Sequence, residues 1–111
     1  MIARTIAFAA GLVLAGSAYA EGPMCRSHRP SHVTYGGLTP QHGYERDHIV
    51  PLCLGGPDTA DNVRYEPLSE AYVKDGAERN ACRYACAAGP SAIAAARTDF
   101  LVGNWRKWLE P

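Results

Sequence analysis

The sequence predicts a small α+β domain that is held together by disulfide bonds. Two short segments of β-forming residues, 44–50 and 62–66, flank a loop rich in glycine and proline. The chain after the second segment has the apolar periodicity of helices. Four cysteines fall in a chain of 111 residues, and small exported domains often need such cross-links in addition to their core.

The composition fits a folded domain and excludes two classes of protein. Hydrophobic residues make up 47% of the chain, which is too many for an intrinsically disordered protein. The 11 basic residues balance the 11 acidic ones, so the chain lacks the basic excess of a protein that coats DNA. A nucleic-acid enzyme with a small local basic patch is compatible with this balance.

Residues 1–20 have the pattern of a secretory signal peptide. Arg4 supplies the positive charge, residues 6–15 are almost continuously apolar, and residues 18–20 read AYA, a small-x-small cleavage site. The apolar run is short for a membrane span, although an uncleaved anchor is the alternative. We therefore expect an exported protein, either periplasmic or secreted, without stable membrane association after cleavage.

The cysteines predict two disulfide bonds, since an even number in an exported chain is typical of a disulfide framework. The spacing of Cys82 and Cys86 places both on one face of a helix. A structural zinc site is the alternative. Three pairings are open and the sequence does not choose among them: the four residues are Cys25, Cys53, Cys82 and Cys86.

Residues 21–43 are predicted to form an irregular N-terminal arm, because their prolines and glycines interrupt any periodicity. The arm contains His28, His32 and His42. A polar, solvated arm explains these histidines, and a metal-binding arm is the alternative.

The next segment predicts two strands. Residues 44–50 alternate and are compatible with a β-strand, and Pro51 ends the ladder. Residues 52–61 contain the sequence GGPD, a strong loop signal, and residues 62–66 form the second predicted strand.

Helices follow the second strand. We expect Ser69 to cap a helix that runs to about Ala87, before Gly89 and Pro90. Its predicted apolar stripe consists of Ala77, Ala81, Tyr84 and Ala85.

The C-terminal segment predicts a second, shorter helix. Ser91 is expected to cap this helix, which extends to about Leu101. Gly103 is predicted to separate it from a final turn at 104–109, whose Trp105 and Trp108 are expected to be core or lid residues.

Several residue types needed for phosphodiester hydrolysis occur in the order strand, loop, strand, helix. That reaction needs a base to deprotonate water and a divalent cation to stabilise the phosphate. Asp47 and His48 are adjacent, so their side chains converge only if the strand ends or bends there. Pro51 and the glycines after it predict such a bend.

The motif spacing resembles that of the HNH endonuclease superfamily. Residues 47–56 read DHIVPLCLGG, Asn62 follows, and residues 74–78 read KDGAE. Small exported bacterial proteins of this superfamily carry the motif DHxxPLxLGG…N…KDxxE. The resemblance covers residues 44–108 and implies a ββα-metal core with additional C-terminal helices, so that residues 44–111 form one domain.

The resemblance implies a role for each motif residue. His48 corresponds to the general base and Asp47 to a metal ligand, while Asn62 braces the loop and orients the histidine ring. The helix is expected to supply a further ligand, with Asp75 as first choice and Glu78 as second. Oxygen ligands favour Mg²⁺ or Mn²⁺ over Zn²⁺. The implied function is an exported metal-dependent endonuclease that cuts DNA, with RNA as the second substrate.

Simpler interpretations remain open for the same residues. Asp75 at i and Arg79 at i+4 would form an ordinary ion pair on a helix surface. Asn62 would be a common turn residue after Asp61. For the whole protein, the alternative is a catalytically silent binding module that keeps the HNH scaffold and its disulfides in the periplasm.

Overall fold

The computed structural model describes Cys25 and residues 32–110. The predicted signal peptide and residues 21–24 and 26–31 of the N-terminal arm, His28 among them, lie outside the described residues. The helices and strands run in the order β1 (Tyr44–His48), β2 (Val63–Pro67), α2 (Leu68–Ala88) and α3 (Pro90–Leu101). Short 3-10 helices are η1 (Tyr35–Gly37), η2 (Leu52–Leu54), η3 (Ala60–Asn62) and η4 (Trp105–Leu109). The predicted α+β class is therefore confirmed.

The two strands form an antiparallel hairpin with a long loop. Their register pairs Tyr44 with Pro67 and His48 with Val63. Beyond the last pair, the Ile49 N–H still donates to the Asn62 carbonyl at 2.7 Å. The chain then leaves the ladder at Pro51, as the sequence predicts, and the loop that follows carries η2 and η3.

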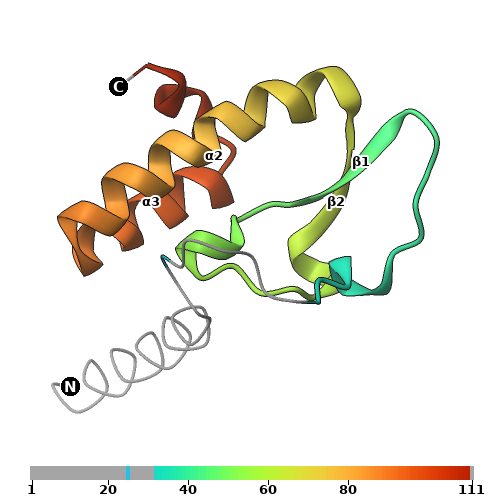
Figure 1. Cartoon of the computed structure of the whole chain (residues 1–111), viewed down its shortest axis with the longest axis horizontal. Helices are drawn as coiled ribbons and strands as arrows, with labels where there is room; N and C mark the ends of the chain where they lie inside the picture. Colours follow the sequence, from blue (N-terminus) through green and yellow to red (C-terminus); the bar gives the residue numbers. More distant parts are fainter. Residues whose placement is uncertain (1–24, 26–31, 111) are drawn as a thin grey trace, which may run out of the picture.

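Helix α2 continues directly from β2, so that hairpin and helix share one corner of the molecule (Figure 1). Ser69 is not the helix cap, because α2 already begins at Leu68 after Pro67. Ser91 is likewise not a cap, because Pro90 is the first residue of α3. Proline is suited to a first helical position, where its fixed φ fits the helix and no N–H is needed.

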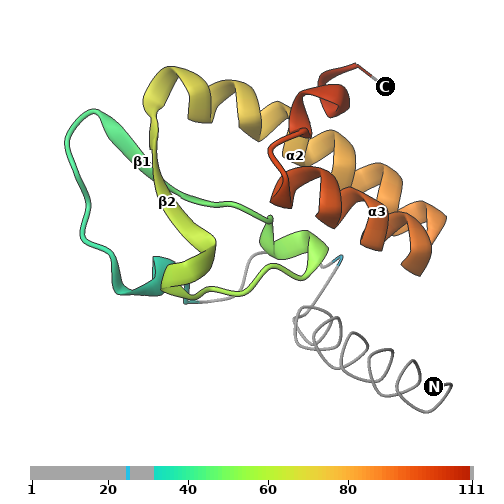
Figure 2. The same cartoon turned by 180° about the vertical axis from the view of Figure 1, so that it is seen from behind.

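The core lies between α2, α3 and η4, which pack together on one side of the hairpin (Figure 2). The predicted stripe on α2 is confirmed for its three alanines, which are fully buried, while Tyr84 is 59% exposed and does not belong to it. Small residues on this face let the helices approach closely. The larger core side chains come from the loop, α3 and η4: Val50, Leu54, Ile93, Phe100 and Trp105.

Two disulfides tie the rest of the chain to α2. Cys53 in η2 bonds to Cys82, and Cys25 bonds to Cys86 one helical turn further on. All four cysteines are thus paired, so none remains as a thiolate for the alternative zinc site. Disulfides are compatible with an extracellular or other oxidising compartment. In the part of the chain that the structure describes, no helix combines the length and apolarity that a membrane crossing requires.

Candidate functional site

His48 lies at the end of β1, where its ring meets the loop between the strands. Its Nε2 is 2.8 Å from Oδ1 of Asp58, and the histidine side chain is 10% exposed. Asp58 also receives two hydrogen bonds on Oδ2, from the Thr34 backbone N–H at 2.6 Å and the Thr34 hydroxyl at 2.8 Å. The loop and the end of the N-terminal arm therefore fix the imidazole together.

The hydrogen bonds to Asp58 identify it as an ionised acceptor. Burial acts to raise its pKa, but the hydrogen bonds from His48 and Thr34 outweigh burial and hold the pKa well below its usual range. An ionised carboxylate has no proton to give, so Nε2 of His48 is the donor in this pair. In neutral His48, Nδ1 is then the nitrogen that carries a lone pair and is able to accept a proton.

Two side chains, Tyr35 and Arg46, extend from one face of the imidazole. The ring of Tyr35 in η1 stacks on His48 with 5.1 Å between centroids. The Arg46 guanidinium lies 4.5 Å above the same tyrosine ring and donates to the Leu38 carbonyl at 2.9 Å. Arg46 and His48 share one face of β1 because they are two residues apart. This face therefore carries a base and a nearby positive charge.

Asn62 braces the loop that holds His48 in place. Its Oδ1 accepts from the Val50 N–H at 3.0 Å, and its Nδ2 donates to the carbonyls of Val50 and Pro57 at 3.0 and 2.9 Å. Gly56 closes the arrangement, because a Cβ there would lie 1.9 Å from the Val50 oxygen. These contacts join both ends of the loop and are more than an ordinary turn requires. They orient the backbone next to His48, and no contact joins Asn62 to the ring itself among the hydrogen bonds of the described residues.

Asp47 faces away from His48, toward α2. Its Oδ2 lies 2.5 Å from the ammonium of Lys74, whose side chain is only 1% exposed. The same ammonium donates to the carbonyls of His48 and Ile49 at 2.7 and 3.4 Å. The expected bend does not bring the two adjacent side chains together, because the β1–β2 ladder continues without interruption through both residues, and neighbouring residues of a regular strand point to opposite faces.

Of the two ligand candidates on α2, Glu78 contacts the Lys74 ammonium and Asp75 does not. Oε2 of Glu78 is 3.3 Å from the Lys74 ammonium, so Glu78 belongs to the same buried group as Asp47. Burial raises the pKa of Glu78 to about 7, while Lys74 acts to lower it and Asp47 to raise it. Burial also raises the pKa of Asp47, again against the opposing influence of Lys74. Asp75 takes part in none of the ion pairs of the described residues, but its negative charge also acts to raise the pKa of Glu78.

The expected metal ligands do not form a ready metal site. Within residues 32–110 and Cys25, no group of three or more His, Cys, Asp and Glu side chains is arranged to hold an ion. The Lys74 ammonium takes the oxygens of Asp47 and Glu78 that a divalent cation would need. As arranged here, the residues do not fit a divalent metal.

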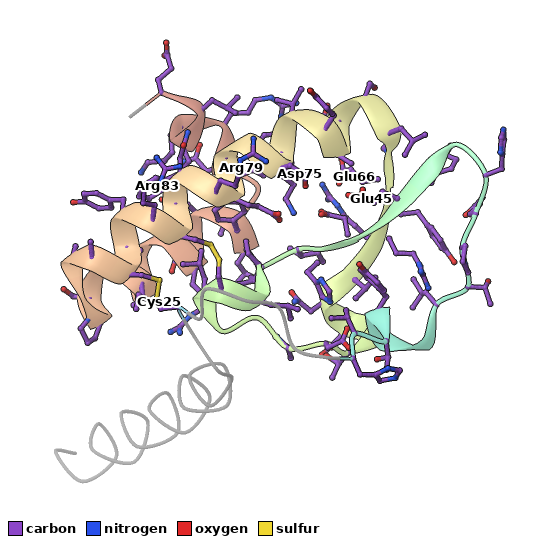
Figure 3. The ribbon with its side chains drawn as sticks, in the orientation of Figure 1. Cys25, Glu45, Glu66, Asp75, Arg79 and Arg83 are labelled. Carbon is purple, nitrogen blue, oxygen red and sulfur yellow. A yellow bond between two sulfur atoms is a disulfide. The ribbon has the colours of Figure 1, made fainter. Side chains whose placement is uncertain are left out.

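Charged side chains continue along α2 and the hairpin (Figure 3). Asp75, Arg79 and Arg83 lie along the helix, and the ion pairs of the described residues do not include the pair between Asp75 and Arg79 that was the alternative to a metal ligand. Glu66 is buried and pairs with Arg64 at 2.7 Å. Positive charge on this side of the molecule is therefore spread out and partly neutralised.

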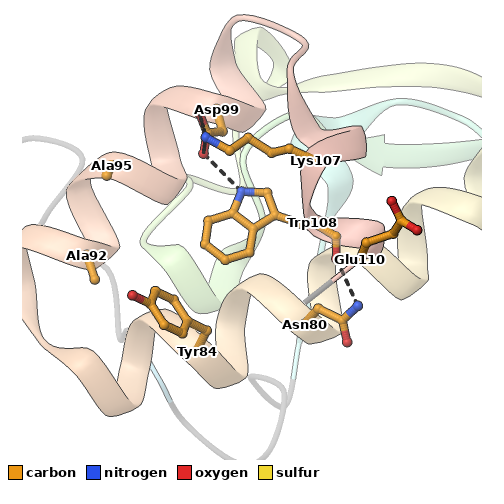
Figure 4. Close-up of a pocket in the computed structure, with 8 residues that line it drawn as sticks. All are labelled: Asn80, Tyr84, Ala92, Ala95, Asp99, Lys107, Trp108 and Glu110. Atoms are coloured by element: carbon orange, nitrogen blue, oxygen red, sulfur yellow. Dashed lines mark hydrogen bonds and ion pairs between the residues drawn. The ribbon is translucent and has the colours of Figure 1, made fainter.

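A separate cavity of about 480 Å³ opens between α2, α3 and η4 (Figure 4). Trp108 and Tyr84 form its aromatic wall, with 5.6 Å between ring centroids. Trp108 donates from Nε1 to Asp99 at 3.0 Å, and its carbonyl accepts from Asn80 at 2.8 Å. The structure confirms Trp105 as a core residue, whereas Trp108 is a partly buried wall of this cavity.

Comparison with known proteins adds no relative. No protein family matches the chain, and neither the curated proteins nor the solved structures contain a match.

Sequence reasoning assigned roles to His48 and Asn62 but none to Asp58 or Lys74, which contact the predicted residues His48 and Asp47 in the structure. Asp58 stands in the loop signal GGPD, where an aspartate is explained by the turn alone. Lys74 belongs to the KDGAE pattern, and a lysine on a helix is expected to be exposed. Its position four residues before Glu78 was the one available signal for an interaction.

Proposed function

We propose that this protein is an exported endonuclease that hydrolyses phosphodiester bonds in DNA, with His48 as general base. The pair formed by His48 and Asp58 carries the proposal. A base must hold a free lone pair, and the ionised Asp58, which takes the proton donated by Nε2, leaves that lone pair on Nδ1 of His48. The resemblance of residues 47–56, Asn62 and residues 74–78 to the HNH pattern supplies the reaction type.

The residues around His48 suit the proposed step. When Nδ1 takes a proton from water, the ring becomes positively charged, and the carboxylate of Asp58 stabilises that charge at 2.8 Å. Tyr35 and Thr34 restrict the ring and the carboxylate, so little reorganisation is needed. Arg46 places a cation near the base, where a phosphate group would be attracted. Asp58 acts in this scheme as a positioning residue.

A cleavage assay tests the proposal. The oxidised protein is incubated with supercoiled plasmid and, in parallel, with a structured RNA, in EDTA, Mg²⁺, Mn²⁺ or Zn²⁺. Replacement of His48 by alanine removes the base, so we expect the cleavage rate to fall at least 100-fold, on the order of the contribution of general base catalysis. Comparison of the reactions with EDTA and with each metal ion shows whether a divalent cation takes part in the reaction.

A second histidine provides the matched control. His42 is exposed in the segment before β1, and His42→Ala should leave the cleavage rate unchanged. Circular dichroism of His48→Ala must show the wild-type fold for the comparison to hold. Wild-type cleavage by a folded His48→Ala variant would exclude His48 as the base.

A catalytically silent binding module is the second candidate, and two observations favour it. Lys74 holds the carboxylates that an HNH enzyme would give to its metal. The cavity beside Trp108 and Tyr84 has an aromatic wall, and such walls are common in binding sites. Absence of cleavage under every condition, from a folded wild-type protein, would favour this candidate over the nuclease.

A further inference from the structure

We propose that the ammonium of Lys74 is the resident cation at the junction of the hairpin and α2, in an oxygen cage that would otherwise take a divalent metal. Four oxygens surround it at 2.5 to 3.4 Å. They are Oδ2 of Asp47, Oε2 of Glu78 and the backbone carbonyls of His48 and Ile49. This inference concerns the cage alone and does not rest on the nuclease proposal.

The chemistry of the cage is that of a hard-cation site. Carboxylate and backbone carbonyl oxygens are the ligands of Mg²⁺, Mn²⁺ and Ca²⁺, and each is equally a hydrogen-bond acceptor for an ammonium group. The cage draws on β1, the residue after it, and α2. One positive ion in it therefore joins the hairpin to the helix and compensates the buried carboxylate of Asp47 and the partly buried carboxylate of Glu78.

The Lys74 side chain is placed so that its ammonium group takes the position of a bound cation. Its side chain is 1% exposed, so its charge is compensated by protein oxygens instead of water. The ring of Phe100 lies 5.6 Å from the ammonium and covers it from the core. A divalent ion entering the cage would have to displace the ammonium, whose hydrogen bonds among the described residues all go to these four oxygens. The folded protein is therefore independent of divalent metal at Asp47 and Glu78.

The first experiment uses the wild-type protein. Thermal unfolding is followed in EDTA and in excess Mn²⁺, and Mn²⁺ binding is titrated by calorimetry and by electron paramagnetic resonance. We expect the same melting temperature in both conditions, and no saturable Mn²⁺ binding that depends on Asp47. Saturable Mn²⁺ binding to wild type that Asp47→Asn abolishes would overturn the proposal, whether or not the protein cuts DNA.

The second experiment removes the ammonium. In Lys74→Ala the four oxygens lose their cation, so the melting temperature in EDTA should fall and Mn²⁺ should bind. With Mn²⁺ at about 100 times its dissociation constant, the melting temperature should rise by roughly 10 °C or more. A Lys74→Ala protein that is unfolded in EDTA and folds when Mn²⁺ is added gives the same support. A folded variant without any Mn²⁺ response would overturn the proposal.

Two further variants make the result specific. Lys107→Ala removes a lysine that is 55% exposed and paired with Asp99, and it should gain no Mn²⁺ response. Lys74→Met keeps the aliphatic stem but not the charge. It replaces Lys74→Ala in the Mn²⁺ experiment if Lys74→Ala is unfolded both in EDTA and in Mn²⁺. A Mn²⁺ response in Lys74→Met that Asp47→Asn removes supports the cage, and its absence in the folded variant counts against it.

Discussion

At the scale of single residues, Asp58 links the candidate site to the pH of the solution. Its pKa is held well below the usual range in the folded protein, whereas an unfolded aspartate titrates near about 3.9. A carboxyl whose folded pKa is lowered stabilises the protein fully above its unfolded pKa. That stabilisation is lost as the pH falls from about 4 toward the folded pKa.

Replacement of Asp58 by asparagine should therefore have an effect that depends on pH. At pH 7 we expect a loss of about 1–3 kcal/mol in the free energy of unfolding, because the hydrogen bonds from Thr34 and His48 lose their charged acceptor. The difference from wild type should shrink as the pH falls below about 4. Urea denaturation at a series of pH values measures this difference.

Asp61 is the matched control for that series. It is exposed, and among the described residues its side chain accepts a hydrogen bond only from the Thr59 hydroxyl in its own turn. Asp61→Asn should therefore change the free energy of unfolding by less than about 0.5 kcal/mol. A loss in Asp58→Asn that is the same at pH 3 and pH 7 would contradict the role of the ionised carboxylate.

The residues that the sequence predicted are those whose chemistry is local or belongs to a motif. Asn62 was expected to brace a loop, and its three hydrogen bonds run within that loop. Asp58 and Lys74 act over 24 and 27 positions, on Thr34 and Asp47 respectively. The contact of Asp58 depends on how the N-terminal arm lies against the loop, and that of Lys74 on how the hairpin docks on α2. A single sequence does not contain that information.

At the scale of elements, Gly76 is the weak point of α2. It lies in the middle of a helix of 21 residues, where glycine costs conformational entropy relative to alanine. A Cβ at this position would meet Arg79 at 3.8 Å and Leu109 at 3.9 Å, which are ordinary contacts. Gly76→Ala should therefore stabilise the protein by about 0.5–1 kcal/mol, measured as a higher urea midpoint with an unchanged slope.

Gly36 provides a control of opposite sign. Its φ is +63°, and a Cβ there would lie 2.4 Å from the backbone nitrogen of Ala60. Gly36→Ala should therefore destabilise the protein, because the clash involves backbone that cannot simply rotate away. A destabilised Gly76→Ala variant would mean that the C-terminal segment around Leu109 lies closer to α2 than the structure places it.

The ends of the helices and strands were predicted from the apolar periodicity and from the prolines and glycines that interrupt it. The predicted strands 44–50 and 62–66 correspond to Tyr44–His48 and Val63–Pro67, and the first helix was expected to end one residue before Ala88. The capping residues were wrong because Pro67 and Pro90 set the helix starts one residue earlier than the serines. Tyr84 was assigned to the core by its periodicity, but the cavity beside Trp108 leaves it exposed.

At the scale of the whole molecule, the cysteine pairing was open because it depends on where two distant segments meet α2. The helix presents Cys82 and Cys86 on one side, as their spacing predicted, but it does not determine which partner arrives at each. The loop carries Cys53 to the inner position, next to the hairpin, and the arm carries Cys25 to the outer one. The resulting bridges fasten the loop after His48 and the arm to the helical half.

The two bridges should contribute differently to stability. Chain entropy alone favours Cys25–Cys86, which spans 61 positions against 29 for Cys53–Cys82, by about 0.7 kcal/mol. Packing favours Cys53–Cys82, since both of its cysteines contact the core cluster while Cys25 is exposed, and each buried group lost costs on the order of 1 kcal/mol. We therefore expect Cys53→Ala/Cys82→Ala to lose more free energy of unfolding in urea than Cys25→Ala/Cys86→Ala, with both losses within about 2–5 kcal/mol. The reverse order would mean that chain entropy outweighs core packing at this end of α2. The reduced wild-type protein separates the two contributions, because it loses both cross-links but keeps the cysteine side chains that pack against the core.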